Sequence, residues 1–210
     1  MSPLEQSLIA FTVAAALMTV TPGIDTALVL RTAAVEGPRR AFWAAAGICL
    51  GCLAWGAIVA LGLGVLLAAS ELAYTVLKWV GAAYLFYLGA TLILSRREDF
   101  AAAFDARRTS AGAGLWFRRG LLTNLLNPKV GIFYVSFLPQ FVPAGADVAA
   151  TTLLLAAIHA ALGLAWFAAL ILATRPLAAA LRKPRTIRIL DRLTGGVFLL
   201  FAGRLALSRD

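Results

Sequence analysis

The chain has 210 residues, of which 61% are hydrophobic and only 14% are charged, and its mean hydropathy is +0.87. A soluble domain is about half apolar and about a quarter charged, so this composition excludes a soluble globule and favours a chain that crosses a membrane repeatedly. The net charge of +9 does not indicate nucleic-acid binding, because the basic residues cluster between apolar stretches instead of following one face.

Six apolar runs are long enough to cross a bilayer, which takes roughly 20 apolar residues per helix. The first run is not expected to be a cleaved secretion signal, since no Lys or Arg precedes it and Glu5 does. The last run is the weakest, because it contains Arg204 and begins beside Asp191 and Arg192. The sequence predicts an all-α polytopic membrane protein with spans at 8–30, 41–67, 72–94, 120–142, 149–173 and 189–207.

The basic residues predict the orientation of these spans. Fifteen of the 19 Lys and Arg lie in or beside the first-to-second, third-to-fourth and fifth-to-sixth connections. Lys and Arg are retained on the cytoplasmic side of membrane proteins, so these connections are expected in the cytoplasm and both termini outside it. If the last run does not cross, the C-terminus is cytoplasmic instead.

The third and sixth spans resemble each other. Residues 81–89 read GAAYLFYLG and residues 195–203 read GGVFLLFAG, with glycines and aromatics at the same offsets. Three spans form each copy, and an odd number places the second copy upside down in the membrane, as in many secondary transporters. The expected single domain of 1–210 has repeat one at 1–95, a basic cytoplasmic loop at 96–119 and repeat two at 120–210. The alternative is chance recurrence of glycine and aromatics in membrane helices.

The first and fourth spans each contain a helix-breaking proline, Pro22 followed by Gly23 in one and Pro128 in the other. Proline removes an amide donor and displaces the carbonyl four residues earlier. Within a bilayer the freed groups need partners in protein, water or substrate. Two breaks at matched places in two halves predict a substrate site between them.

Asp25 and Lys129 follow these breaks, and each costs roughly 2.5 to 3.5 kcal/mol to place in mid-membrane. Such charges face a wet cavity or pair with each other, so both are predicted to bind substrate, with Asn124 and Asn127 as neutral hydrogen-bonding partners. Asp25 is also the candidate for proton coupling. The alternatives are a structural ion pair between Asp25 and Lys129, or an Asp25 side chain that reaches the cytoplasmic surface.

These motifs make the chain similar to the lysine exporter (LysE/RhtB) family of amino-acid exporters. The family's proline-glycine-proline motif with a following Asn or Asp stands here as Pro22-Gly23-Ile24-Asp25, with Ile24 in place of the second proline. Its later motifs stand as Arg119-Gly120, Asn127-Pro128-Lys129 and Leu138-Pro139-Gln140-Phe141, and the stretch 81–85 is also similar. The resemblance covers nearly the whole chain. It implies proton-linked export of an amino acid or a similar small metabolite across the inner membrane.

Two rival functions stay open, an inorganic ion exporter and a membrane thiol-disulfide electron carrier. The second depends on Cys49 and Cys52, which are expected to be inert because they lie mid-helix among apolar residues. The lone His159 is expected to bond a neighbouring helix in preference to relaying protons. No metal site, cofactor or enzymatic activity is predicted. Small-residue helix faces allow a homodimer but do not show one.

Overall fold

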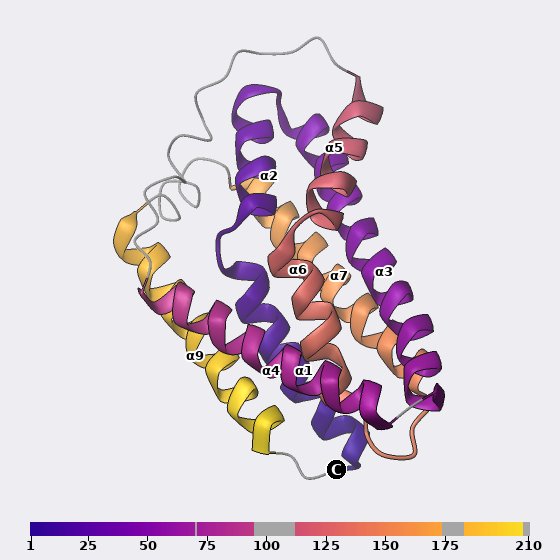
Figure 1. Ribbon diagram of the computed structural model, residues 1–210. Coiled ribbons are helices and arrows are strands. Elements are labelled where there is room, and N and C mark those ends of the chain that lie inside the picture. The colour runs from indigo at the N-terminus through magenta and orange to yellow at the C-terminus, as the bar shows by residue number, and fades with distance from the viewer. Residues whose placement is uncertain (70, 95–111, 174–182, 208–210) are drawn as a thin grey trace.

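A computed structural model describes residues 1–69, 71–94, 112–173 and 183–207, and every regular element in these ranges is helical. Helices α1 and α2 form a broken pair, α3 and α4 follow, α5 and α6 form a second broken pair, and α7 and α9 complete the chain (Figure 1). Their bounds are α1 Pro3–Val20, α2 Ile24–Val35, α3 Pro38–Ala69, α4 Glu71–Leu94, α5 Ala113–Leu125, α6 Pro128–Ile132, α7 Val148–Leu172 and α9 Pro184–Leu207.

Among the described residues, three helices are long and apolar enough to cross a membrane, namely Pro3–Val20, Pro38–Gly62 and Val148–Leu172. The pair Ala113–Leu125 and Pro128–Phe141 makes a fourth candidate, with a bend of 53° at its break. The structure therefore supports three to four spans by length and composition. Helix α4 matches the third expected span, and α9 covers the sixth but begins at Pro184 instead of residue 189. Their crossing of the bilayer stays a prediction.

Both broken helices break for the same local reason. Thr21 and Asn127 each precede a proline and are extended, with ψ of 116° and 108° respectively. The ring of a following proline excludes the helical conformation, so the helix ends there and restarts one to three residues later. The breaks predicted at Pro22 and Pro128 are present.

The fourth span begins earlier than expected, at Ala113 instead of residue 120. Arg118 and Arg119 lower the hydropathy of its first turns, so these turns do not form part of an apolar run in the sequence. In the structure Trp116 is fully buried, and the guanidinium of Arg119 lies 4.7 Å from the centroid of its ring. This cation–π contact and the buried indole hold the amphipathic start of α5 against the protein.

Beyond the second break the helix changes character twice. After α6 it widens to a π-helix over Phe133–Phe137 and then tightens to a 3-10 helix over Leu138–Phe141. Pro139 lacks the amide hydrogen that a regular helix needs, which explains why the regular pattern does not continue through it. Single-turn π segments occur often at functional sites, and this one begins four residues after Lys129.

Close backbone contact joins the two halves of the chain through α3 and α5. A Cβ on Gly47 would lie 2.0 Å from the carbonyl oxygen of Phe117, and one on Gly120 would lie 2.0 Å from that of Ala44. No larger residue fits either place without moving a backbone, so these glycines permit the tight packing of the two helices. α3 also packs along α7, and α4 packs along α9.

Two apolar clusters flank the middle of the molecule. The larger is aromatic, with ring centroids of Phe137 and Phe201 4.4 Å apart and those of Phe11 and Phe141 5.4 Å apart. The smaller joins α2, α3 and α7 through buried residues such as Leu30, Ile48 and Phe167. The space between the clusters contains both helix breaks, which positions the site.

Candidate functional site

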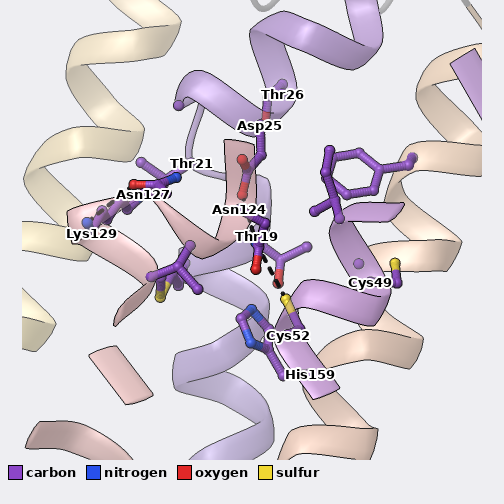
Figure 2. A pocket seen from close by; sticks show the side chains of 16 residues that line it. Thr19, Thr21, Asp25, Thr26, Cys49, Cys52, Asn124, Asn127, Lys129 and His159 are labelled. Carbon is purple, nitrogen blue, oxygen red and sulfur yellow. Dashed lines mark hydrogen bonds between the residues drawn. The ribbon is translucent and has the colours of Figure 1, made fainter. Parts of the chain in front are cut away.

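A cavity lies where the two helix breaks meet the middle of α3 and α7 (Figure 2). Met18, Cys52 and Val130 of its wall belong to the aromatic cluster, whereas Ile48 and Phe167 belong to the smaller cluster. Its volume of about 50 Å³ accommodates a few water molecules. An apolar layer therefore lies on each side of a small polar chamber. The polar residues of its wall are Thr19, Thr21, Asp25, Thr26, Cys49, Cys52, Asn124, Asn127, Lys129 and His159.

The carboxylate of Asp25 is held by the opposite half of the chain. Asn124 at the end of α5 donates a hydrogen bond from Nδ2 to Oδ2 of Asp25 over 2.9 Å (Figure 2). Asp25 lies in the first turn of α2, where the positive end of the helix dipole also favours a carboxylate. The two broken helices are thus joined by one charge-assisted hydrogen bond.

A glycine of α3 makes room for this hydrogen bond. A Cβ on Gly51 would lie 2.5 Å from Oδ1 of Asn124 and 2.9 Å from its Cβ. Asn124 is fully buried, so its side chain has no other direction in which to move without cost. Gly51 therefore positions Asn124, which in turn positions Asp25.

Two acceptor oxygens in the cavity lack a donor among the described residues. They are Oδ1 of Asp25 and Oδ1 of Asn124, and both are buried. Buried polar atoms are nearly always hydrogen-bonded, and each one left unpaired costs roughly 1 to 3 kcal/mol. A cation with several N–H or O–H donors would satisfy both oxygens.

The side chain of Lys129 extends from the second helix break toward the first. It follows the second break, yet its Nζ lies 3.9 Å from where a Cβ on Gly23 would stand, beside the first break. Asn127 supports this segment as the N-cap of α6, with Oδ1 accepting from the amide of Lys129 over 3.1 Å. The positive charge of Lys129 also acts on the carboxylate of Asp25. The site therefore has an anionic side and a cationic side, each anchored at one break.

The structure brings five of the seven expected site residues to this wall, namely Gly23, Asp25, Asn124, Asn127 and Lys129. The two prolines have other places. Pro22 shapes the first break, and Pro128 lines a neighbouring apolar groove that also touches Asn127. The hydrogen bond of Asp25 to Asn124 joins two residues that were each expected to bind substrate separately.

Sequence reasoning missed the contribution of α3 and α7. Cys49 and Cys52 are free thiols in the cavity wall, and Sγ of Cys52 accepts from Nδ2 of Asn124 over 3.6 Å. Their spacing of about one helical turn, which places both thiols on one side of the helix, was the available signal. No group of three or more metal-binding side chains occurs among the residues that the structure describes.

His159 bonds a neighbouring helix. Its Nδ1 lies 3.0 Å from the hydroxyl of Tyr134 in the π segment, with both side chains buried. This contact joins α7 to the helix that carries Lys129. His159 also lines the cavity, near Cys52 (Figure 2).

Comparison with known proteins identifies the family of the chain. A family model described as LysE type translocator matches residues 16–209. The chain is 28% identical to a homoserine/homoserine lactone efflux protein of Salmonella typhimurium, with 95% of this chain and 96% of the relative covered. It is 28% identical to a leucine efflux protein of Klebsiella pneumoniae, with 93% and 92% covered.

An uncharacterized membrane protein of Pseudomonas aeruginosa is 35% identical, with 87% of this chain and 85% of the relative covered. No solved structure matches the chain. The match of the family model extends over both helix breaks and nearly the whole length of the protein. The chain belongs to the LysE type translocator family of membrane transporters.

Proposed function

We propose that the protein is a secondary active exporter of amino acids or similar small metabolites across the inner membrane, coupled to proton entry. The efflux of homoserine and leucine named for two relatives supports this substrate class. The observation that carries the proposal is the opposition of charge across one cavity. Asp25 and Asn124 supply acceptors without donors, and Lys129 supplies a cation on the other side.

An amino-acid zwitterion matches this arrangement. Its ammonium group would donate to Oδ1 of Asp25 and to Oδ1 of Asn124. Its carboxylate would meet the ammonium of Lys129 and backbone amides at the start of a half-helix, where anions are favoured. Asn127 would add a neutral hydrogen bond. The substrate thereby balances two charges that are expensive to keep in a membrane.

Asp25 is also the proposed site of proton coupling. A proton arriving from outside would neutralise its carboxylate and weaken the attraction for the substrate's ammonium group. Release to the outside would follow, and the proton would leave toward the cytoplasm before the next substrate binds. The hydrogen bond from Asn124 would hold the carboxyl group in place while the substrate is bound.

The packing of the helices supports the proposed inverted repeat. The first broken pair contacts α7 as well as α3, and the second contacts α3, so each pair packs on the long helix of the other half, as expected when a two-fold axis exchanges the halves. Gly89 of α4 packs against the carbonyl of Gly195 in α9, the counterpart of Gly81 in the internal repeat. Six crossings and rocking of one half against the other would then alternate access to the cavity.

The proposed orientation places the basic end in the cytoplasm and both termini outside. In Figure 1 the turn between α2 and α3 lies at the same end as the start of α5, while α1 begins at the other end. Arg39, Arg40, Arg118 and Arg119 belong to that first end, in agreement with the rule that cytoplasmic ends are basic.

Efflux from proteoliposomes tests the proposal. A panel of radiolabelled amino acids is loaded, a pH gradient is imposed, and the wild type is compared with Asp25→Asn and Lys129→Met. We expect gradient-driven efflux that either substitution lowers roughly ten- to a hundred-fold, the range for losing one charge-assisted interaction. The matched controls Asp147→Asn and Lys183→Met change exposed residues outside the cavity and should leave efflux unchanged. Wild-type-like efflux by Asp25→Asn, with unchanged pH dependence, would contradict the proposal.

A further inference from the structure

An apolar groove of about 390 Å³ opens beside the second helix break. Trp55 of α3, Val80 of α4 and Leu126 after α5 form its walls, and Gly131 of α6 lies at its floor. The indole of Trp55 lies against Gly131, where an added Cβ would stand 2.7 Å from Cζ2. None of its described lining residues carries a charge. Apart from the indole of Trp55, only Asn127 and Ser136 among them have polar side chains.

The groove and the charged cavity share one residue. Asn127 lines both, while Lys129, two residues on, lines the cavity and Pro128 between them lines the groove. The break in the helix thus separates a charged chamber from an apolar one over three consecutive residues. A ligand with its polar group at Lys129 therefore lies next to the groove, with Asn127 between them.

We infer that the groove receives the substrate's side chain and makes the protein selective for amino acids with large apolar side chains. This inference rests on the proposed export function and names the substrate class of that same site. The charged groups near the α-carbon stay at Asp25 and Lys129, and the side chain passes Asn127. The volume lies in the range of pockets that hold small organic ligands. Each buried methylene is worth about four-fold in affinity, so a leucine side chain gains far more than that of alanine.

A phospholipid acyl chain is the competing occupant, because Val80 and Leu126 at the rim are 62% and 78% exposed. The position of the groove next to the charged cavity, with Asn127 lining both, favours the substrate. An acyl chain has no group for Asn127 or for the charges beyond it, whereas a zwitterion with an apolar side chain matches the change in polarity along this path.

The test fills the groove from an exposed wall. Val80→Trp places a bulky ring at its rim, and Val76→Trp is the matched control, since Val76 is 54% exposed on the same helix and is not among the lining residues of either cavity. Efflux of leucine and of alanine is measured in the same proteoliposomes. We expect Val80→Trp to lower the leucine-to-alanine efflux ratio roughly ten-fold, and Val76→Trp to leave it unchanged. Leu126→Trp, from the opposite wall, should give the same change.

Alanine efflux also reports that each variant is folded. If Val80→Trp and Leu126→Trp leave the ratio at its wild-type value, or lower both substrates alike, the inference is overturned while the export function stands. A common loss that varies with the acyl-chain length of the vesicle lipid identifies an acyl chain as the occupant and overturns it too. A wild type that exports no amino acid overturns the export function and this inference together.

Discussion

Asn124 holds Asp25 across 99 residues of sequence, through a hydrogen bond of 2.9 Å that joins the end of α5 to the start of α2. The bond connects the two helix breaks and fixes one carboxylate oxygen while the other keeps its accepting capacity. Any movement of one broken helix against the other must therefore alter the carboxylate that the transport proposal places in contact with substrate and proton.

Removal of Asn124 should act through Asp25. Asn124→Ala leaves both oxygens of a buried carboxylate without this donor, so we expect a fall in efflux of roughly ten-fold and a loss of about 1 to 3 kcal/mol in stability. The double variant Asp25→Asn/Asn124→Ala should export no less than Asp25→Asn alone, because the second change removes a partner that is no longer needed. Efflux assays on the four proteins measure this coupling. Independent, multiplying losses would show that Asn124 acts separately.

Gly51→Ala should disturb the same pair from α3. The new methyl group would lie 2.5 Å from Oδ1 of Asn124, so the amide must turn away from Asp25. We expect efflux to fall about ten-fold, as for loss of the hydrogen bond itself. Gly62→Ala is the matched control on the same helix, since nothing lies within 4 Å of its added Cβ. Equal efflux in the two alanine variants would contradict the positioning role of Gly51.

Transport should not need the thiols of Cys49 and Cys52, but a reagent bound to them should block it. Cysteine in a packed helix acts as a small apolar residue, so the variant Cys49→Ala/Cys52→Ala should retain most of the wild-type efflux. A small mercurial that reaches the cavity should inhibit the wild type and spare the double variant. Loss of all activity in the untreated double variant would instead support the thiol-disulfide carrier.

The proposed topology predicts that reporter proteins fused before and after α9 lie on opposite sides of the membrane. Green fluorescent protein fused after Lys183 should fluoresce and alkaline phosphatase fused there should be inactive, because that connection is expected in the cytoplasm. Fusions after Asp210 should give the reverse pattern if α9 crosses the membrane. Fluorescence at both points would show that the last helix does not cross.

The sequence predicted the features that depend on local chemistry. Pro22 and Pro128 each exclude a helical residue before them, and both breaks lie where they were expected. Likewise, the ends of α7 match the fifth apolar run to within one residue. Proline chemistry and hydropathy act over a few neighbouring residues, so no tertiary contact is needed to predict them.

The missed features depend on tertiary contacts. The first turns of α5 are stabilised by the burial of Trp116, which hydropathy does not report. The partnership of Asn124 with Asp25 depends on the space above Gly51, which only the packing of α3 on α5 defines. The placement of Cys52 in the cavity wall has the same origin. Residue type and position predicted the candidates, whereas their partners required the structure.

The most direct test of the account matches each charge of the site to one charge of the substrate. Export of labelled leucine is measured in the wild type, Asp25→Asn and Lys129→Met, in competition with three unlabelled compounds. Leucine has both charges, leucinamide lacks the carboxylate, and N-acetylleucine lacks the ammonium group. Asp25→Asn should remove the penalty for losing the ammonium, and Lys129→Met should remove the penalty for losing the carboxylate. Penalties that stay the same in all three proteins would contradict the placement of the substrate between Asp25 and Lys129.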